Sequence, residues 1–169
     1  LSIGRLVDYK GYEYAIRALT GIDEKVIYKI VGNGPLMKKL KKLIVSLNLN
    51  KRVFLMGSVS ENKKNKLLDE ADIFLFPSIS ASEAYGLVQL EAMAYSLPII
   101  NTNLKNGVNY FAPDDIAITC RVKSSQEIFN AINKLIKDKN FYKNKSNDSF
   151  KNLSRFNHEK MIKIFKEML

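Results

Sequence analysis

Six short apolar runs recur along the chain and alternate with segments whose apolar residues are spaced as in a helix. The runs are residues 1–4, 26–31, 53–56, 73–76, 98–101 and 116–122. They are rich in branched and aromatic side chains and mostly apolar at every position, which is typical of strands covered on both faces. We therefore expect an α/β fold, a doubly wound sheet of six parallel strands with helices on both faces.

The segments between the runs carry helix signals. Helices are predicted for residues 12–19, 36–47, 62–71, 86–95 and 124–138. Ser60 is suited to cap the third of these, and Ser124 with Glu127 forms a capping-box pattern at the start of the fifth. Residues 141–169 have no strand pattern, so we expect one or two C-terminal helices, broken near residues 155–157.

The 169 residues fit a single domain, residues 1–169, and 46% hydrophobic residues are enough for a buried core. No apolar stretch is long enough to span a membrane. The start, from Leu1, has no signal-peptide pattern and resembles a core strand entered midway, so we expect a piece of a longer protein. Cys120 is the only cysteine, which fits a reducing compartment and a cytoplasmic location.

The net charge of +10 is compatible with binding to nucleic acid or to an anionic membrane surface. The lysines are scattered, however, with small clusters within residues 38–42 and 63–64, and such clusters are usually solvated helix faces. A non-catalytic anion or nucleic-acid binding module therefore remains the alternative function. It predicts binding that weakens steeply with salt.

Two cations flank the end of the first predicted strand. Arg5 follows that strand, and Lys10 precedes the first predicted helix. At the carboxyl edge of a parallel sheet, such a pair suits a diphosphate, since Arg grips phosphate oxygens in pairs and Lys acts as a point charge. Both residues are also compatible with ordinary surface charges.

Two glutamates separated by seven residues surround the start of the fourth predicted helix. Gly86 and Leu87 lie at this start, where free N–H groups and the positive end of the helix dipole attract phosphate. Glu91 lies a little over one turn inside and has apolar neighbours, so its carboxylate needs a partner, such as a pair of sugar hydroxyls. Glu83 lies in the preceding loop, where it can face a polar ligand above the sheet.

Together these segments resemble the nucleotide-sugar-binding, C-terminal domain of family 4 retaining glycosyltransferases, which have the GT-B fold. The resemblance extends from Ser2 to about residue 137. It rests on Gly4-Arg5-Leu6 with Lys10-Gly11, on Gly32-Asn33-Gly34-Pro35, on Phe76-Pro77-Ser78, and on Ser82-Glu83-Ala84-Tyr85-Gly86-Leu87 through Glu91-Ala92-Met93-Ala94. It implies a Rossmann-like domain that binds the donor, with an N-terminal acceptor domain elsewhere in the same chain.

The resemblance also implies a role for each matching residue. Arg5 and Lys10 correspond to the pair that binds the donor diphosphate, and the backbone of Gly86 and Leu87 corresponds to donors to the same group. Glu91 corresponds to the glutamate that holds the ribose hydroxyls. Glu83 corresponds to the catalytic glutamate beside the donor sugar. Gly57 and Val59 fall, in a looser match, where the family places the base.

The resemblance further implies an activity: a hexosyltransferase-type enzyme that uses a UDP-, GDP- or ADP-sugar and needs neither a cofactor nor a metal. The resemblance also implies a growing glycan or a lipid-linked sugar as the acceptor, with the enzyme at the inner face of the membrane, and it does not imply nucleic acid as a partner. We expect this chain alone to bind nucleotide but to transfer nothing. A sugar-nucleotide epimerase or a phosphorylase of the same fold is a further alternative.

The chain departs from the family pattern in residues 101–115. The family usually has a Gly-Gly-x-x-Glu turn after this strand, whereas this chain has a shorter Asn-rich segment that leads to Asp114-Asp115. The departure puts the usual contacts near the donor sugar in doubt. We expect the two aspartates to be solvated in a loop rather than to hold a metal.

Overall fold

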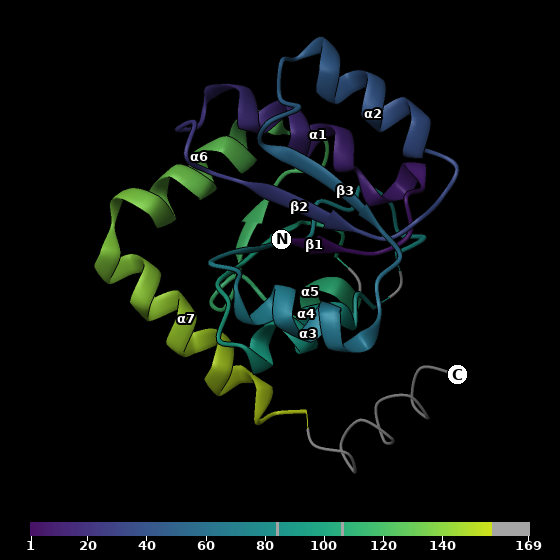
Figure 1. The fold of residues 1–169 in the computed structure, drawn as a ribbon. Coiled ribbons are helices and arrows are strands. Elements are labelled where there is room, and N and C mark those ends of the chain that lie inside the picture. Colours follow the sequence, from purple (N-terminus) through teal and green to yellow (C-terminus); the bar gives the residue numbers. More distant parts are fainter. Residues whose placement is uncertain (84, 106, 157–169) are drawn as a thin grey trace.

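The computed structural model describes residues 1–83, 85–105 and 107–156, in which strands and helices alternate as predicted (Figure 1). The strands are β1 (Ser2–Ile3), β2 (Tyr28–Val31), β3 (Val53–Gly57), β4 (Phe74–Leu75), β5 (Ile99–Thr102) and β6 (Ile118–Cys120). The α-helices are α1 (Tyr12–Ala18), α2 (Met37–Ser46), α3 (Glu61–Asp69), α4 (Val88–Ala94), α5 (Gly107–Phe111), α6 (Ser125–Lys137) and α7 (Lys139–Leu153). Two 3-10 turns flank α1, at Asp8–Lys10 and Leu19–Gly21.

All the paired strands run parallel, but they form two sheets of three, in the orders β1-β2-β3 and β4-β5-β6. The prediction of one six-stranded sheet is therefore wrong. The two sheets meet at Leu1, whose backbone nitrogen donates to the Ile73 carbonyl and whose carbonyl accepts from the Leu75 N–H, both at 2.8 Å. This contact involves the residue before β1 rather than the strand itself, and β1 and β4 are not paired with each other.

The helices cover both faces of the strands, as predicted for a doubly wound fold. Figure 1 shows α1, α2 and α6 on one side of the strands and α3, α4 and α5 on the other. Helix α7 packs against α6 and α4 and so reaches from the first layer to the second. None of the helices in the described ranges is long and apolar enough to cross a membrane.

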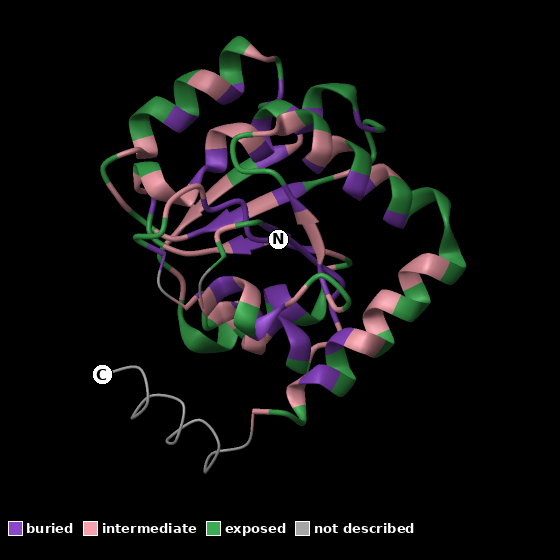
Figure 2. Ribbon diagram, turned by 180° about the vertical axis from the view of Figure 1, so that it is seen from behind, coloured by how far each residue is buried: buried purple, intermediate pink, exposed green. Residues whose placement is uncertain are grey.

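The apolar runs are buried between these layers (Figure 2). One cluster lies under α1, α2 and α6 and includes Ile16 and Ile30, each 0% exposed. A second cluster lies under α4 and α5 and includes Phe74 and Met93, also 0% exposed. Burial on both faces explains why the strands are apolar at nearly every position.

The predicted capping by Ser60 and Ser124 is confirmed, but the Glu127 carboxylate accepts from the Arg121 N–H rather than completing the capping box. Ser60 Oγ accepts from the Lys63 N–H at the start of α3, and Ser124 Oγ accepts from the Glu127 N–H at the start of α6. Helix α4 begins two residues later than predicted, at Val88. The predicted helical region after residue 156 lies outside the described residues.

Candidate functional site

The candidate residues gather where the strands end. The loop after β1 is tied to the loop after β4 by a hydrogen bond of 2.8 Å from the Ile79 N–H to the Tyr9 carbonyl. The loop after β2 meets the end of β3 through a bond of 2.8 Å from the Gly32 N–H to the Gly57 carbonyl. Ligands of parallel α/β sheets bind at this carboxyl edge, close to the point where strand order reverses.

Gly11 brings the loop after β1 against the loop after β4. Its φ of +63° lies in the left-handed region, and a Cβ on it would lie 2.1 Å from the Pro77 carbonyl oxygen. Only glycine fits such a conformation and such a close approach without strain. The backbone contact sets the distance between the loop that carries Lys10 and the loop that carries Glu83.

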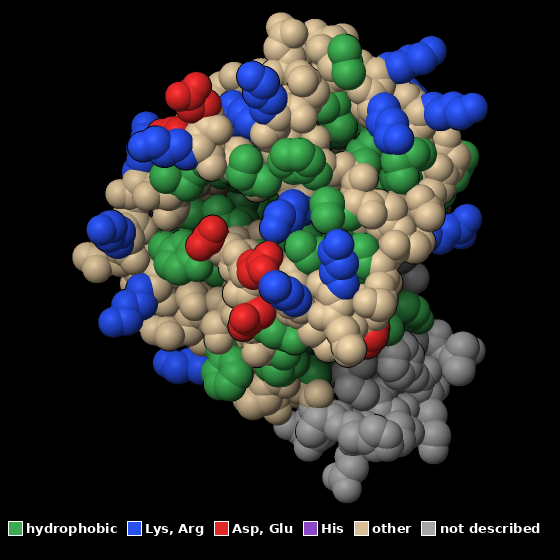
Figure 3. All heavy atoms as spheres, viewed as in Figure 1, with side chains coloured by type: hydrophobic (Ala, Val, Ile, Leu, Met, Phe, Trp, Pro, Cys, Tyr) green, Lys and Arg blue, Asp and Glu red, His purple; other side chains and the backbone are tan. Residues whose placement is uncertain are grey.

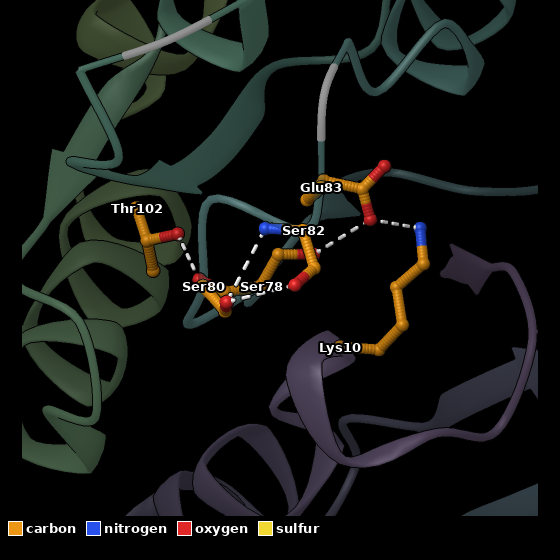
Figure 4. Close-up of polar contacts among 6 residues, drawn as sticks. All are labelled: Lys10, Ser78, Ser80, Ser82, Glu83 and Thr102. Carbon is orange, nitrogen blue, oxygen red and sulfur yellow. Dashed lines mark hydrogen bonds and ion pairs between the residues drawn. The ribbon is translucent and has the colours of Figure 1, made fainter.

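Lys10 and Glu83 form an ion pair at this junction (Figure 4). Their side chains are only 12% and 11% exposed, and the Lys10 ammonium lies 4.8 Å from the centroid of the Phe76 ring. Ser78 Oγ donates to the same Glu83 oxygen at 3.2 Å, and Thr102 Oγ1 donates to the Ser78 carbonyl. The predicted phosphate-binding cation and the predicted catalytic carboxylate are therefore in direct contact.

Tyr12 lies under this pair. It is 2% exposed, and a Cβ on Gly4 would lie 2.8 Å from its hydroxyl and 3.3 Å from the Lys10 ammonium. Burial raises the pKa of Tyr12 well above its usual range, and the nearby Tyr28 and Glu83 raise it further. The phenol therefore stays neutral, and it adds no negative charge beside Glu83.

Arg5 follows Gly4 at the end of β1, and its side chain is exposed to solvent. It belongs to the same loop as Lys10, so the two predicted phosphate-binding cations lie at the same edge of the sheet. Unlike Lys10, Arg5 has an accessible guanidinium that can reorient toward an anion.

Gly86 and Leu87 precede α4. Gly86 has a φ of +64°, and a Cβ on it would lie 2.8 Å from the Phe76 ring, so packing against Phe76 alone requires glycine. Leu87 is the N-cap of α4 and is 42% exposed. Gly86 borders the junction, because Phe76 also contacts Lys10, and Leu87 is the next residue along the chain.

Glu91 lies in the first turn of α4 and is paired with a residue that the sequence did not single out. Its Oε2 atom lies 2.5 Å from the Lys64 ammonium on α3. Lys64 also pairs with Glu61 at 2.8 Å. The expectation that Glu91 needs a partner is confirmed, but this partner is a cation from the neighbouring helix.

Gly57 and Val59, the predicted base-binding residues, lie at the end of β3 and in the loop before α3. The loop after β2 supports this segment, since Asn33 Nδ2 donates to Ser58 Oγ at 3.1 Å. Val59 is half-buried. The same loop leads directly into α3, so it connects the predicted base site to Lys64.

The atypical segment 101–115 contains a short helix, α5, that the sequence analysis missed. Asn109 Oδ1 accepts from the Leu104 and Lys105 N–H groups, both at 2.9 Å, and its Nδ2 donates to the Thr102 carbonyl. Asn101 is fully buried and donates to Gln89 Oε1 at 3.2 Å and to the Ala112 carbonyl at 2.8 Å. Buried amides therefore fix this segment against α4, beside the site.

The aspartates of this segment lie away from the site. Lys145 on α7 donates to the Asp115 carbonyl at 2.7 Å, and Asp114 borders a shallow hollow beside β6. Within residues 1–83, 85–105 and 107–156, no three His, Cys, Asp or Glu side chains are close enough together to hold a metal. That the activity needs no metal stays a prediction.

A hollow of about 790 Å³ lies at the opposite edge of the strands. Its lining includes Leu1, Tyr28 and Ile73, which precede or begin β1, β2 and β4. Figure 3 shows hydrophobic side chains around a hollow on this face, with lysines and arginines scattered and acidic side chains among them. None of the predicted site residues lines this hollow, and the positive charge on this face is not gathered in one patch.

Three comparisons place the chain among known proteins. The family model of the glycosyl transferases group 1 matches residues 1–152. The phosphatidylinositol N-acetylglucosaminyltransferase GPI3 subunit of Saccharomyces cerevisiae is 31% identical over 137 residues, which are 79% of this chain and 30% of that protein. The chain thus spans about a third of the length of this relative.

Solved structures share the fold. HepE from Anabaena in complex with UDP superposes with a TM-score of 0.82 at 24% identity, over 91% of this chain and 43% of that one. The C-terminal domain of the group 1 glycosyl transferase LpcC from Francisella tularensis gives a TM-score of 0.79 at 23% identity, over 90% of this chain and 83% of that one.

Proposed function

The chain belongs to the glycosyl transferases group 1 and is a GT-B glycosyltransferase domain, and from this premise we propose that it is the donor-binding, C-terminal half of a family 4 retaining enzyme. The enzyme moves a hexosyl group from a nucleotide-diphosphate sugar to a glycan or a lipid-linked acceptor. One observation carries the proposal: Lys10 meets Glu83 at the carboxyl edge of the strands, between two loops that a backbone bond joins.

The residues of the site contact different parts of the donor. Arg5 and Lys10 bind the diphosphate, together with the backbone N–H groups of Gly86 and Leu87. Glu91 accepts hydrogen bonds from the ribose hydroxyls. Gly57 and the half-buried Val59 border the base, at the end of β3 and in the loop that leads into α3.

Glu83 lies beside the donor sugar and acts at the reaction centre. When the bond between the anomeric carbon and the diphosphate breaks, negative charge develops on the leaving group. Preorganised cations stabilise such charge best where they are shielded from water, and the Lys10 side chain is 12% exposed. Because Ser78 and Lys10 both contact Glu83 Oε2, this carboxylate is held in place before the donor arrives.

The remainder of the enzyme supplies the acceptor. The likeness to a C-terminal domain and the partial coverage of HepE both support an N-terminal domain in the same chain. The GPI3 subunit is named for a phosphatidylinositol acceptor, which supports a lipid-linked acceptor. We further propose that the enzyme works in the cytoplasm, at the inner face of the membrane. We expect the 169 residues alone to bind nucleotide and to transfer nothing.

Calorimetric titration with UDP, GDP and ADP tests the proposal. We expect one of them to bind, Glu91→Ala to abolish that binding and Arg5→Ala to weaken it. Glu70→Ala is the matched control, because Glu70 is an exposed carboxylate at the opposite edge, paired with Lys29. Binding that neither Glu91→Ala nor Arg5→Ala alters would refute the site, and no binding of any of the three would refute the function.

A further inference from the structure

Helix α3 carries three lysines, and one of them differs from the others in its surroundings. Lys66 is 74% exposed and lies 3.8 Å from Glu70, as expected of a solvated helix face. Lys64 is only 19% exposed. A lysine that gives up most of its contact with water needs compensating charge nearby.

Two carboxylates supply that charge. Glu61 lies one turn earlier on α3, with its Oε1 atom 2.8 Å from the Lys64 ammonium. Glu91 reaches the same ammonium from α4, at 2.5 Å. Hydrogen bonds first to Glu61 and then to Glu91 raise the pKa of Lys64, so it stays charged throughout the neutral range.

The contact with Lys64 makes the two oxygens of the Glu91 carboxylate differ in their surroundings. Oε2 is the atom that Lys64 contacts, and it is shielded from solvent. The side chain as a whole is 43% exposed, so its accessible surface belongs to its other atoms. Oε1 is therefore the oxygen left to accept a hydrogen bond from a ligand.

Resting on the proposed function, we infer that Lys64 is a positioning residue for the nucleotide site, which holds the Glu91 carboxylate so that its second oxygen faces the ribose hydroxyls. Without Lys64, Glu91 has the like charge of Glu61 as a neighbour and no cation to hold it. The carboxylate then turns toward water and must be reordered by each ligand that binds.

Lys64 acts through Glu91, so its loss affects only those ligands that Glu91 recognises. Whichever of UDP, GDP and ADP binds is compared with its 2′-deoxy form. The pair, UDP and 2′-deoxy-UDP for example, differs by one ribose hydroxyl and shares the diphosphate and the base. The ratio of their dissociation constants therefore reports on the carboxylate's contact with the ribose. A purely structural role for Lys64 would weaken both ligands equally and leave this ratio unchanged.

The test measures that ratio by calorimetry for the whole 169-residue chain and its variants. We expect the wild type to prefer UDP by roughly tenfold, the worth of one hydrogen bond to a charged group. Lys64→Met and the milder Lys64→Gln should bring the ratio close to one. Lys64→Arg keeps the charge and should keep the ratio close to the wild-type value. Lys66→Met, on the same helix, should leave it at the wild-type value.

The outcomes separate the two proposals. If the wild type prefers UDP and Lys64→Met or Lys64→Gln keeps that preference, the positioning role is refuted and the proposed function stands. An equal loss for both ligands in folded variants also refutes it, since the role of Lys64 is then purely structural. If the wild type binds no nucleotide diphosphate, the proposed function fails and the inference fails with it.

Discussion

The ammonium group of Lys10 contacts the Glu83 carboxylate between the loop after β1 and the loop after β4, and both side chains are almost removed from solvent. Removing one partner of such a pair is costly, because it leaves the other charge buried without compensation. A diphosphate that binds Lys10 must therefore replace or share the contact with Glu83. Substitutions of Lys10 and of Glu83 separate the contribution of Lys10 to ligand binding from the competition of Glu83 for the same ammonium.

Lys10→Met should weaken binding of the nucleotide diphosphate by roughly tenfold to a hundredfold, the effect of removing a charged hydrogen-bond donor. The aliphatic stem of Met can still pack on Phe76, so the loss reflects the charge. Calorimetry measures it. Lys38→Met, an exposed lysine on α2, serves as the control, and equal affinities for the wild type and Lys10→Met would contradict the role.

Glu83→Gln should lower the melting temperature and enlarge the stabilisation that UDP provides. The amide cannot neutralise Lys10, so the ligand's phosphates take over that task in the variant. Thermal melts with and without UDP measure the two shifts. If UDP raises the melting temperature of Glu83→Gln less than that of the wild type, the carboxylate does not compete with the diphosphate for Lys10.

Gly11→Ala should destabilise the domain by about 1–3 kcal/mol and weaken nucleotide binding as well. The new methyl group would lie 2.1 Å from the Pro77 carbonyl at a φ of +63°, so the two loops must separate. Urea unfolding and calorimetry measure both effects. In the control Gly21→Ala the methyl group meets the Phe129 ring, which can move, and nucleotide binding should be unchanged.

Asn101→Leu should lower the free energy of unfolding by about 2–4 kcal/mol, because it leaves several buried polar partners unsatisfied. These partners are Gln89, the Ala112 carbonyl and Thr119, whose hydroxyl donates to Asn101 Oδ1 at 3.0 Å. Urea unfolding measures the change. Asn130→Leu, on the exposed face of α6, should change it by less than about 0.5 kcal/mol.

Cys120 should make stability fall as the pH rises above 9. Burial raises the pKa of its thiol from 9.0 to about 12, so between these values the unfolded chain loses the proton and the folded chain keeps it. The unfolded state then binds fewer protons, and stability falls by about 1.4 kcal/mol per pH unit from this group.

Urea unfolding of the wild type and Cys120→Val between pH 8 and pH 11 measures this contribution, because other ionising groups are common to both chains. The variant should lose less stability over this interval. Parallel losses in the two chains would contradict the raised pKa.

The sequence predicted the elements that depend on local pattern. Each of the six strands overlaps a predicted apolar run, with β3 and β5 each ending one residue beyond it, and Ser60 and Ser124 cap the helices as expected. It did not predict α5, whose start depends on the Asn109 side chain and on its bond to Thr102. The division into two sheets also depends on pairing between segments far apart in the sequence, which no local pattern reports.

In the candidate site too, the residues marked by local pattern were predicted, and the contacts between distant segments were not. Arg5, Lys10, Glu83 and Glu91 were singled out from their places at strand ends and helix starts, and the fold brings Lys10 to Glu83. Lys64 was missed because a lysine in a lysine-rich helix has the same local signal as its solvated neighbours. Only its 19% exposure and its two carboxylate neighbours distinguish it.

The two sheets are joined at a seam, the backbone contact of Leu1 with Ile73 and Leu75, and this seam has a mechanical consequence. Arg5 and Lys10 belong to the β1 side of the seam, Glu83 and Glu91 belong to the β4 side, and the backbone bonds of Leu1 join the strands between them. A nucleotide-diphosphate sugar that contacts all four residues would act as a cross-link over that joint. Its binding would stiffen the whole domain, so amide hydrogens far from the ligand, on both sheets, would exchange more slowly once it is bound.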